Sequence, residues 1–330
     1  MSPVPLSILD LAFVGEHETV RESFEGSVQL ARRAEELGYR RIWYAEHHNI
    51  RSIASSATAV LIAHVAAKTE RIRLGSGGIM LPNHAPLVIA EQFGTLATLH
   101  PDRIDLGLGR APGTDQETFR ALRRDPAAAD RFPQDVLELQ GYLSDETRVP
   151  HVQANPGKGT HVPLYILGSS LFGAQLAAVL GLPYAFASHF APDALHDALA
   201  AYRERFKPSE QLAEPYAMAG INVIAADTED EAAEQLHRTR RARARHLFNA
   251  GGRRITDEEA EVILRSAQAV HVDRMMTYTA AGTPKVVREH LDDFVERTGV
   301  DEVISVHPAD SVARRVRSVE LLAQAGDLGG

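Results

Sequence analysis

The sequence contains no cysteine among its 330 residues, which excludes disulfide bonds, thiolate zinc sites, iron–sulfur clusters and cysteine nucleophiles. It also has no run of about eighteen apolar residues, so we expect no membrane span. The first residues, Met1-Ser2-Pro3-Val4-Pro5, form neither a basic leader nor an apolar signal core. We therefore expect a cytoplasmic protein without a secretory peptide.

Basic residues are outnumbered: 35 lysines and arginines stand against 44 aspartates and glutamates, giving a net charge of -9. The chain as a whole therefore lacks the positive field that nucleic-acid binding usually needs. One local exception is the arginine cluster Arg238, Arg240, Arg241, Arg243 and Arg245. Acidic residues precede this cluster on the same expected helix, and acid first with base last suits the helix dipole. We interpret the cluster as a solvated helix face.

No linker rich in Ser, Gly or Pro divides the chain, so we expect one domain spanning residues 1–330. Apolar runs alternate with amphipathic helical stretches from end to end. The eight expected strands are Leu6–Leu11, Arg41–Ala45, Ile72–Gly75, Ile104–Gly107, Pro163–Leu167, Tyr184–Ala187, Ala219–Ile224 and Glu302–Val306. Near-continuous apolar strands separated by helices indicate parallel strands covered on both faces, and eight such units favour a (β/α)₈ TIM barrel over a doubly wound sheet.

Two segments interrupt this pattern. Residues 145–162, rich in polar residues, proline and glycine, read as a long loop before the fifth strand. Residues 251–281 form an insertion after strand seven and its long helix, ending at Gly282-Thr283-Pro284, where a new helix begins. Loops that follow barrel strands stand on the catalytic face, so this insertion is expected near the site.

Candidate catalytic and ligand-binding residues follow the second and third expected strands. Glu46, His47 and His48 come directly after strand two, where a (β/α)₈ enzyme keeps its chemistry. Strand three leads into Gly75-Ser76-Gly77-Gly78, and we interpret this glycine-rich stretch as a bare wall on which a flat ligand could lie. Glu46 could also be a structural carboxylate paired with nearby donors, and His48 could be either substrate wall or structural.

The fourth and fifth strand ends indicate an anion site. Arg110 provides a fixed cation just past strand four, and Gly168-Ser169-Ser170 opens a helix after strand five. Backbone N–H groups, hydroxyls and a helix start converge there, so a phosphate would fit, although the turn could also be a simple N-cap. His189, after strand six, is a candidate for the substrate pocket, while His307, after strand eight, receives no role.

Taken in order, these strand ends resemble the bacterial luciferase-like flavin oxidoreductase family, and the resemblance spans nearly the whole chain. It rests on Ala45-Glu46-His47-His48, Gly77-Gly78 with Leu81-Pro82, Gly109-Arg110 and Gly168-Ser169-Ser170. The family implies a (β/α)₈ barrel, an insertion after strand seven that covers the site, a homodimer, and reduced FMN supplied by a separate reductase. It further implies a monooxygenase that uses O₂ to oxygenate a small organic substrate.

The resemblance also implies roles for individual residues. Gly77-Gly78 corresponds to a cis peptide beside the flavin ring, and Arg110 to a cation that contacts the flavin phosphate or ring. Gly168-Ser169-Ser170 corresponds to the phosphate-contacting turn, and His47 to the proton-transferring histidine with Glu46 beside it. His48 and His189 are then substrate-binding candidates. Gly109 stands where luciferases proper carry a reactive cysteine, so light emission is not implied.

Other functions stay open at this stage. A deazaflavin (F420) oxidoreductase of the same fold and a non-catalytic flavin-binding protein are both compatible with the sequence. A metal-dependent hydrolase is the third, because His47, His48, His84 and Glu46 all follow strands and imidazole suits zinc. Adjacent histidines on a strand point to opposite faces, however, which works against one ion shared by His47 and His48. We expect no bound metal.

The stretch Ala54 to Ala67 is small or apolar almost all round, unlike a surface helix with one wet face. An isologous dimer that packs this helix against its copy would cover the second side. We also expect that valine at Gly77 or Gly78 abolishes flavin binding while the barrel still folds.

Overall fold

The structure is a computed structural model that describes residues 4–111, 116–248 and 255–328. Its strands form one parallel sheet in the order β6-β5-β4-β3-β2-β1-β9-β7-β8, and an additional β6–β7 pairing closes eight of them into a barrel. The strands are β1 (Leu6–Asp10), β2 (Arg41–Tyr44), β3 (Arg73–Met80), β4 (Ile104–Gly109), β5 (Leu164–Gly168), β6 (Tyr184–Phe186), β7 (Ala217–Ala225), β8 (Thr279–Gly282) and β9 (Glu302–Val306). The (β/α)₈ barrel predicted from the sequence is confirmed.

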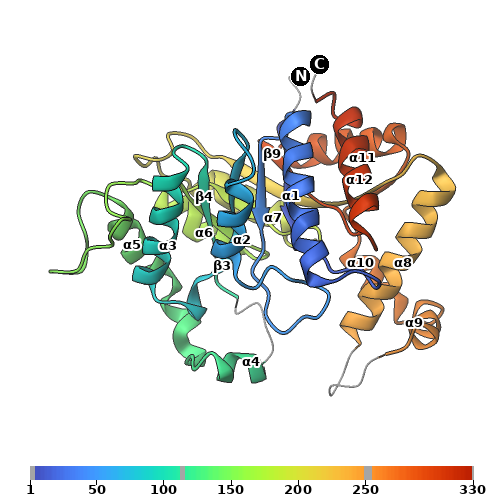
Figure 1. The fold of residues 1–330 in the computed structure, drawn as a ribbon, viewed down its shortest axis with the longest axis horizontal. Helices are drawn as coiled ribbons and strands as arrows, with labels where there is room; N and C mark the ends of the chain where they lie inside the picture. The colour runs from blue at the N-terminus through green and yellow to red at the C-terminus, as the bar shows by residue number, and fades with distance from the viewer. Residues whose placement is uncertain (1–3, 112–115, 249–254, 329–330) are drawn as a thin grey trace.

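Helices surround the barrel (Figure 1). They are α1 (Val20–Leu37), α2 (Thr58–Ala66), α3 (Pro86–Leu99), α4 (Gln116–Ala121), α5 (Phe132–Leu143), α6 (Leu171–Leu180), α7 (Leu195–Arg205), α8 (Glu229–Leu247), α9 (Asp257–Leu264), α10 (Ala269–Met275), α11 (Pro284–Thr298) and α12 (Val312–Ala325), with 3₁₀ turns at Leu81–Asn83 and Pro126–Arg131. Among the described residues, no helix is long and apolar enough to cross a membrane.

Local sequence signals set the ends of α1. Thr19 and Glu22 form a reciprocal capping box at its start, which satisfies two backbone N–H groups that the helix leaves free. Gly38 ends it with φ 84°, a left-handed conformation that glycine adopts without a side-chain penalty. The 145–162 segment is a loop without helix or strand, as predicted.

The expected strand count was one too low. Thr279–Gly282 forms β8, which pairs with the second half of β7 outside the closed barrel and lies in the segment predicted as insertion. The remainder of that segment forms α9 and α10, next to α8 (Figure 1), while its first residues, 251–254, lie outside the described part of the chain. The predicted helix start after Gly282 is confirmed by α11.

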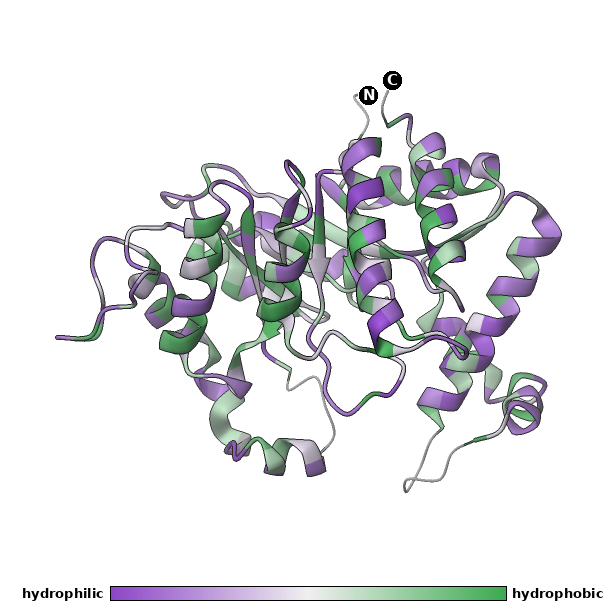
Figure 2. Ribbon diagram, viewed as in Figure 1, coloured by the Kyte–Doolittle hydropathy of each residue, from purple (hydrophilic) through white to green (hydrophobic). Residues whose placement is uncertain are grey.

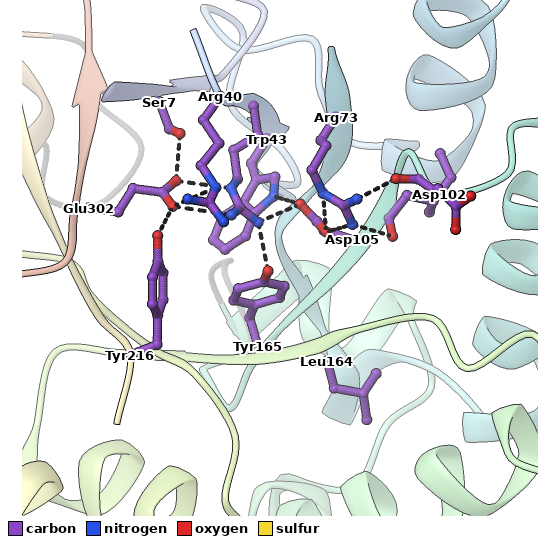
Figure 3. Close-up of polar contacts among 12 residues, drawn as sticks. Ser7, Arg40, Trp43, Arg73, Asp102, Asp105, Leu164, Tyr165, Tyr216 and Glu302 are labelled. Atoms are coloured by element: carbon purple, nitrogen blue, oxygen red, sulfur yellow. Dashed lines mark hydrogen bonds and ion pairs between the residues drawn. The ribbon is translucent and has the colours of Figure 1, made fainter. Parts of the chain in front are cut away.

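A buried polar network closes the barrel at the N-terminal ends of its strands (Figure 3). Arg41, 1% exposed, donates to Asp105 at 2.8 Å and to the hydroxyl of Tyr165 at 2.7 Å, and pairs with Glu302 at 2.9 Å. Burial lowers the pKa of Arg41, but the charges of Asp105 and Glu302 outweigh burial and raise it overall. The network therefore lies opposite the C-terminal ends of the strands, where enzymes of this fold place their active sites.

Candidate active site

All strand pairings are parallel, so the carboxyl ends of the strands meet at one rim of the barrel. The residues predicted from the sequence belong to this rim. They are Glu46, His47 and His48 after β2, Gly77 and Gly78 in β3, Arg110 after β4, Gly168, Ser169 and Ser170 between β5 and α6, and His189 after β6. The structure thus assembles at one edge the residues that the sequence spreads over about 140 positions.

Glu46 is an acceptor for several donors at once. Its carboxylate is 1% exposed and accepts hydrogen bonds from Nε2 of His48 at 2.8 Å, Nε2 of His84 at 2.9 Å and the backbone N–H of Met80 at 3.0 Å. Burial raises the pKa of Glu46, but the hydrogen bonds from the two histidines outweigh burial and lower it to about 2. Glu46 is therefore a permanent carboxylate, which favours the structural reading over proton transfer.

The same contacts bear on His48 and on the hydrolase alternative. The hydrogen bond to Glu46 raises the pKa of His48, so this ring is held by the carboxylate rather than left free to face a ligand. Among residues 4–111, 116–248 and 255–328, no three His, Asp or Glu side chains are arranged to hold a metal ion. His48 and His84 instead direct their Nε2 atoms at one carboxylate.

His47 and His189 are neutral imidazoles at the rim. Burial is the main cause that lowers the pKa of His47, and the charge of Glu46 offsets it only in part. His189 is 8% exposed, and burial together with the charge of Arg243 lowers its pKa to about 3. The Nδ1 atoms of both rings are buried and have no hydrogen-bond partner in the described structure. Unsatisfied buried polar atoms of this kind call for a partner, and the Nδ1 atom of His189 faces Gly220 of β7.

The glycines of β3 and β4 have a different role from the one expected. The Gly77–Gly78 peptide is cis, as predicted, but it lies within β3 and not in a turn after the strand. A Cβ at Gly77 would come within 2.5 Å of the Leu9 side chain, and one at Gly78 within 2.8 Å of the Gly107 carbonyl. These glycines let neighbouring strands approach, so valine at either position is expected to disturb the barrel itself, contrary to the expectation from sequence.

Arg110 and the start of α6 come together through an aromatic side chain. The Arg110 guanidinium lies 4.2 Å from the centroid of the Phe172 ring, in the first turn of α6. Ser170 is the N-cap of this helix, yet its side chain makes no capping hydrogen bond, and both Ser169 and Ser170 are exposed. A fixed cation, two hydroxyls and free backbone N–H groups therefore share one location.

Sequence reasoning missed several residues of this rim. His84 was considered only as a metal ligand, although it fixes Glu46, and Phe172 was not considered. His307, left without a role, is buried and bonds to Ser305 and Ser318, which makes it structural. Periodicity gives no sign of the contacts of His84 with Glu46 and of Phe172 with Arg110, because they join segments distant in sequence.

The arginine cluster on α8 divides into two groups. Four members form ion pairs: Arg238 with Glu234 and Asp310, Arg240 with Asp273, Arg241 with Asp257 and Glu261, and Arg245 with Asp257. These pairs confirm the interpretation of a solvated face. Arg243 is the exception: it forms no ion pair with any described residue, and burial lowers its pKa.

A parallel barrel with a cation and a helix start at the rim, beside neutral histidines, is typical of a barrel enzyme that binds an anionic ligand there. A family model described as luciferase-like monooxygenase matches residues 4–302. The chain belongs to this family. The family places it among oxidoreductases that use O₂ and a small-molecule substrate.

Two relatives match over nearly their whole length. A protein of Escherichia coli K12 described as a luciferase-like monooxygenase is 47% identical over 96% of each chain. The N-acetyl-S-alkylcysteine monooxygenase of Bacillus subtilis is 33% identical over 98% of each chain.

Solved structures share the fold. Apo-MsnO8 superposes with a TM-score of 0.88 at 35% identity, covering 98% of this chain and 99% of that one. The oxygenating constituent of 3,6-diketocamphane monooxygenase from Pseudomonas putida, in complex with FMN, has a TM-score of 0.70 at 17% identity, covering 98% of each chain. An F420-dependent secondary alcohol dehydrogenase has a TM-score of 0.72 at 16% identity, covering 97% and 98%. At these lower identities the likeness shows the fold alone.

Proposed function

We propose that this protein is a monooxygenase that takes reduced FMN as a cosubstrate and uses O₂ to oxygenate a small organic molecule. The observation that carries the proposal is the joining of Arg110, Phe172 and the α6 start into one anion site at the same rim as a neutral His47. Membership of the luciferase-like monooxygenase family supports the reaction class.

The residues at the rim fit reduced FMN. The phosphate end would bind to Arg110, to the hydroxyls of Ser169 and Ser170, and to the first N–H groups of α6, because a guanidinium fork and a helix start both suit phosphate oxygens. Stacking on Phe172 holds the Arg110 guanidinium in place and reduces the entropy lost when the phosphate binds. When bound, reduced flavin supplies the electrons and the reactivity toward O₂ that amino-acid side chains lack.

His47 is the side chain suited to moving a proton beside the flavin ring. Its lowered pKa keeps the ring neutral near pH 7, so Nδ1 or Nε2 can accept a proton during the reaction and return it afterwards. Glu46 cannot share this work, since its pKa of about 2 keeps it ionised. Its role is to fix His48, His84 and the backbone of Met80, and so to position the loop that carries His47.

The choice between FMN, a deazaflavin and a purely binding role can be tested with one titration series. We expect anaerobic protein to bind reduced FMN more tightly than oxidised FMN, FAD or reduced deazaflavin F420. Oxygen uptake coupled to a separate flavin reductase then distinguishes an enzyme from a flavin carrier. Preference for F420, or binding of reduced FMN without any effect on its reaction with oxygen, contradicts the proposal.

A further inference from the structure

Arg243 differs from every other arginine of the α8 cluster. Its four neighbours all reach carboxylates at the surface, whereas Arg243 is half-buried and has neither an ion pair nor a hydrogen-bond acceptor among the described residues. Burial lowers the pKa of Arg243. A partly desolvated guanidinium without a counter-ion is costly and stays charged, so an anionic ligand is the natural partner.

Arg243 acts electrostatically on the two rim imidazoles. The charge of Arg243 contributes to the lowered pKa of both His189 and His47. His189 lies directly over β7, where a Cβ at Gly220 would come within 2.4 Å of its Nδ1 atom. Both rings leave a buried Nδ1 atom unpaired. Arg243 itself belongs to α8 and is separate in the chain from Arg110 and the α6 start.

A largely apolar groove is lined by residues that follow His189 and Arg243 in the chain, and Asp193, His271 and Arg274 also line it. Its volume is about 470 Å³, and Phe190, Pro192, Leu247, Phe248 and Met275 supply most of its apolar wall. Phe190 follows His189 and packs edge-on against its ring at 4.9 Å. Leu247 lies one turn after Arg243 on the same side of α8. The same two segments therefore provide both the charged end and the apolar wall.

We propose that this cluster and groove form the subsite for the organic substrate, and that the substrate is an organic acid with an apolar body. Arg243 binds its carboxylate, and the groove between Phe190 and Leu247 takes the apolar part. The inference rests on the proposed function, because it assigns the substrate class of that same reaction. A guanidinium is suited to this choice, since its fork matches both oxygens of a carboxylate.

The test uses octanoate and octanamide as probes, because they share one chain and differ in charge. Calorimetric titration of the full-length protein without flavin should show saturable binding of octanoate and at least tenfold weaker binding of octanamide. Arg243→Gln should weaken octanoate binding by about 10- to 100-fold, the range expected for charge-assisted hydrogen bonds, and leave octanamide binding unchanged. Shortening the acid should weaken binding by about fourfold per methylene.

Arg240→Gln is the matched control, because it removes an arginine of the same helix that pairs with Asp273 at the surface, and it should bind octanoate like the wild type. Arg243→Lys keeps the charge and should retain part of the affinity. Equal binding of acid and amide, wild-type binding by Arg243→Gln, or no saturable octanoate binding overturns the inference. Anaerobic titration of the same variants with reduced FMN separates the two claims, since Arg243→Gln should bind reduced FMN normally. If the wild type did not bind reduced FMN, that result would instead refute the proposed function.

Discussion

Glu46 and His47 are adjacent in sequence and electrostatically opposite. Glu46 accepts N–H donors from three directions and has a pKa of about 2, while burial lowers the pKa of His47 and leaves its Nδ1 atom without a partner. One residue is locked in its charged form and the other is neutral near pH 7. This contrast is why we propose His47, and not Glu46, for proton transfer at this rim.

Replacing His47 with alanine should separate binding from turnover. We expect His47→Ala to bind reduced FMN with wild-type affinity and to lose about 10²- to 10⁴-fold in turnover, the range typical of a positioned acid–base group. Single-turnover product formation by the variant, compared with the wild type, checks this. Wild-type rates in that assay would show that His47 only lines the wall.

The pH profile provides a second readout of the same role. Turnover that needs neutral His47 should fall on acidification through a pKa below the ordinary 6.5. Arg243 is one of the charges that lower this pKa, so Arg243→Gln should move the acid limb of the profile to higher pH. An acid limb that stays in place would contradict the electrostatic link between the two residues.

Glu46→Gln should change the titration of His48. The hydrogen bond to Glu46 raises the pKa of His48 above 6.5, so this pair contributes stability that is present below pH 6.5 and is lost as the pH rises through the folded-state pKa. We expect the pKa of His48, measured by NMR, to fall in Glu46→Gln, and the excess stability at pH 5.5 over pH 8 to shrink. Asp273→Asn, which alters an exposed pair, should leave both quantities unchanged. A pKa of His48 that does not fall in Glu46→Gln would show that the carboxylate does not hold the ring.

Among the elements, those marked by local chemistry are predictable and those defined by distant partners are not. The ends of α1 are marked within the segment itself by Thr19, Glu22 and Gly38. The sequence analysis misses β8 because this four-residue strand is defined by its pairing with β7, which is distant in sequence. β3 is longer than predicted because its glycines accommodate the close approach of β4. From sequence alone, the low strand propensity of glycine ends the predicted strand at Gly75.

The candidate site also contains residues that can be predicted from the sequence and residues that cannot. Strand-end residues such as Arg110 and His47 follow from barrel topology, because parallel strands deliver their carboxyl ends to one rim. Arg243 does not follow, because the sequence shows five similar arginines on one helix and only their partners distinguish them. Which arginine lacks a partner depends on how α8 packs against α9, α10 and β8.

The network at the N-terminal end of the barrel predicts a large stability effect. Asp105 accepts hydrogen bonds from Arg41, Arg73 and Trp43. Asp105→Ala would break a buried ion pair and leave Glu302 as the one remaining carboxylate beside buried Arg41 among the described residues. We expect the free energy of unfolding to fall by about 3–5 kcal/mol, measured by urea titration. Asp273→Ala, which breaks an exposed pair, should cost about 0–1 kcal/mol. A similar cost for both variants would contradict the role given to this network.

At the scale of the whole molecule, α2 and α3 leave apolar side chains outside. Val60 is 70% exposed and Leu99 65% exposed, and α2 is largely hydrophobic while α8 is largely hydrophilic in Figure 2. We expect an isologous dimer that covers this face, with a dimeric mass in light scattering at micromolar concentration. Val60→Glu should weaken the dimer, whereas Val262→Glu, at an equally exposed valine of α9, should not. A monomeric wild type would contradict this.

The central claim, that Arg110 and the start of α6 hold the phosphate of reduced FMN, is tested most directly by a thermodynamic cycle. Anaerobic titrations of the wild type and Arg110→Ala with reduced FMN and reduced riboflavin vary the cation and the phosphate independently. We predict that Arg110→Ala binds reduced FMN about 10- to 100-fold more weakly and binds reduced riboflavin like the wild type. Equal losses for both flavins, or no loss for reduced FMN, would contradict the account.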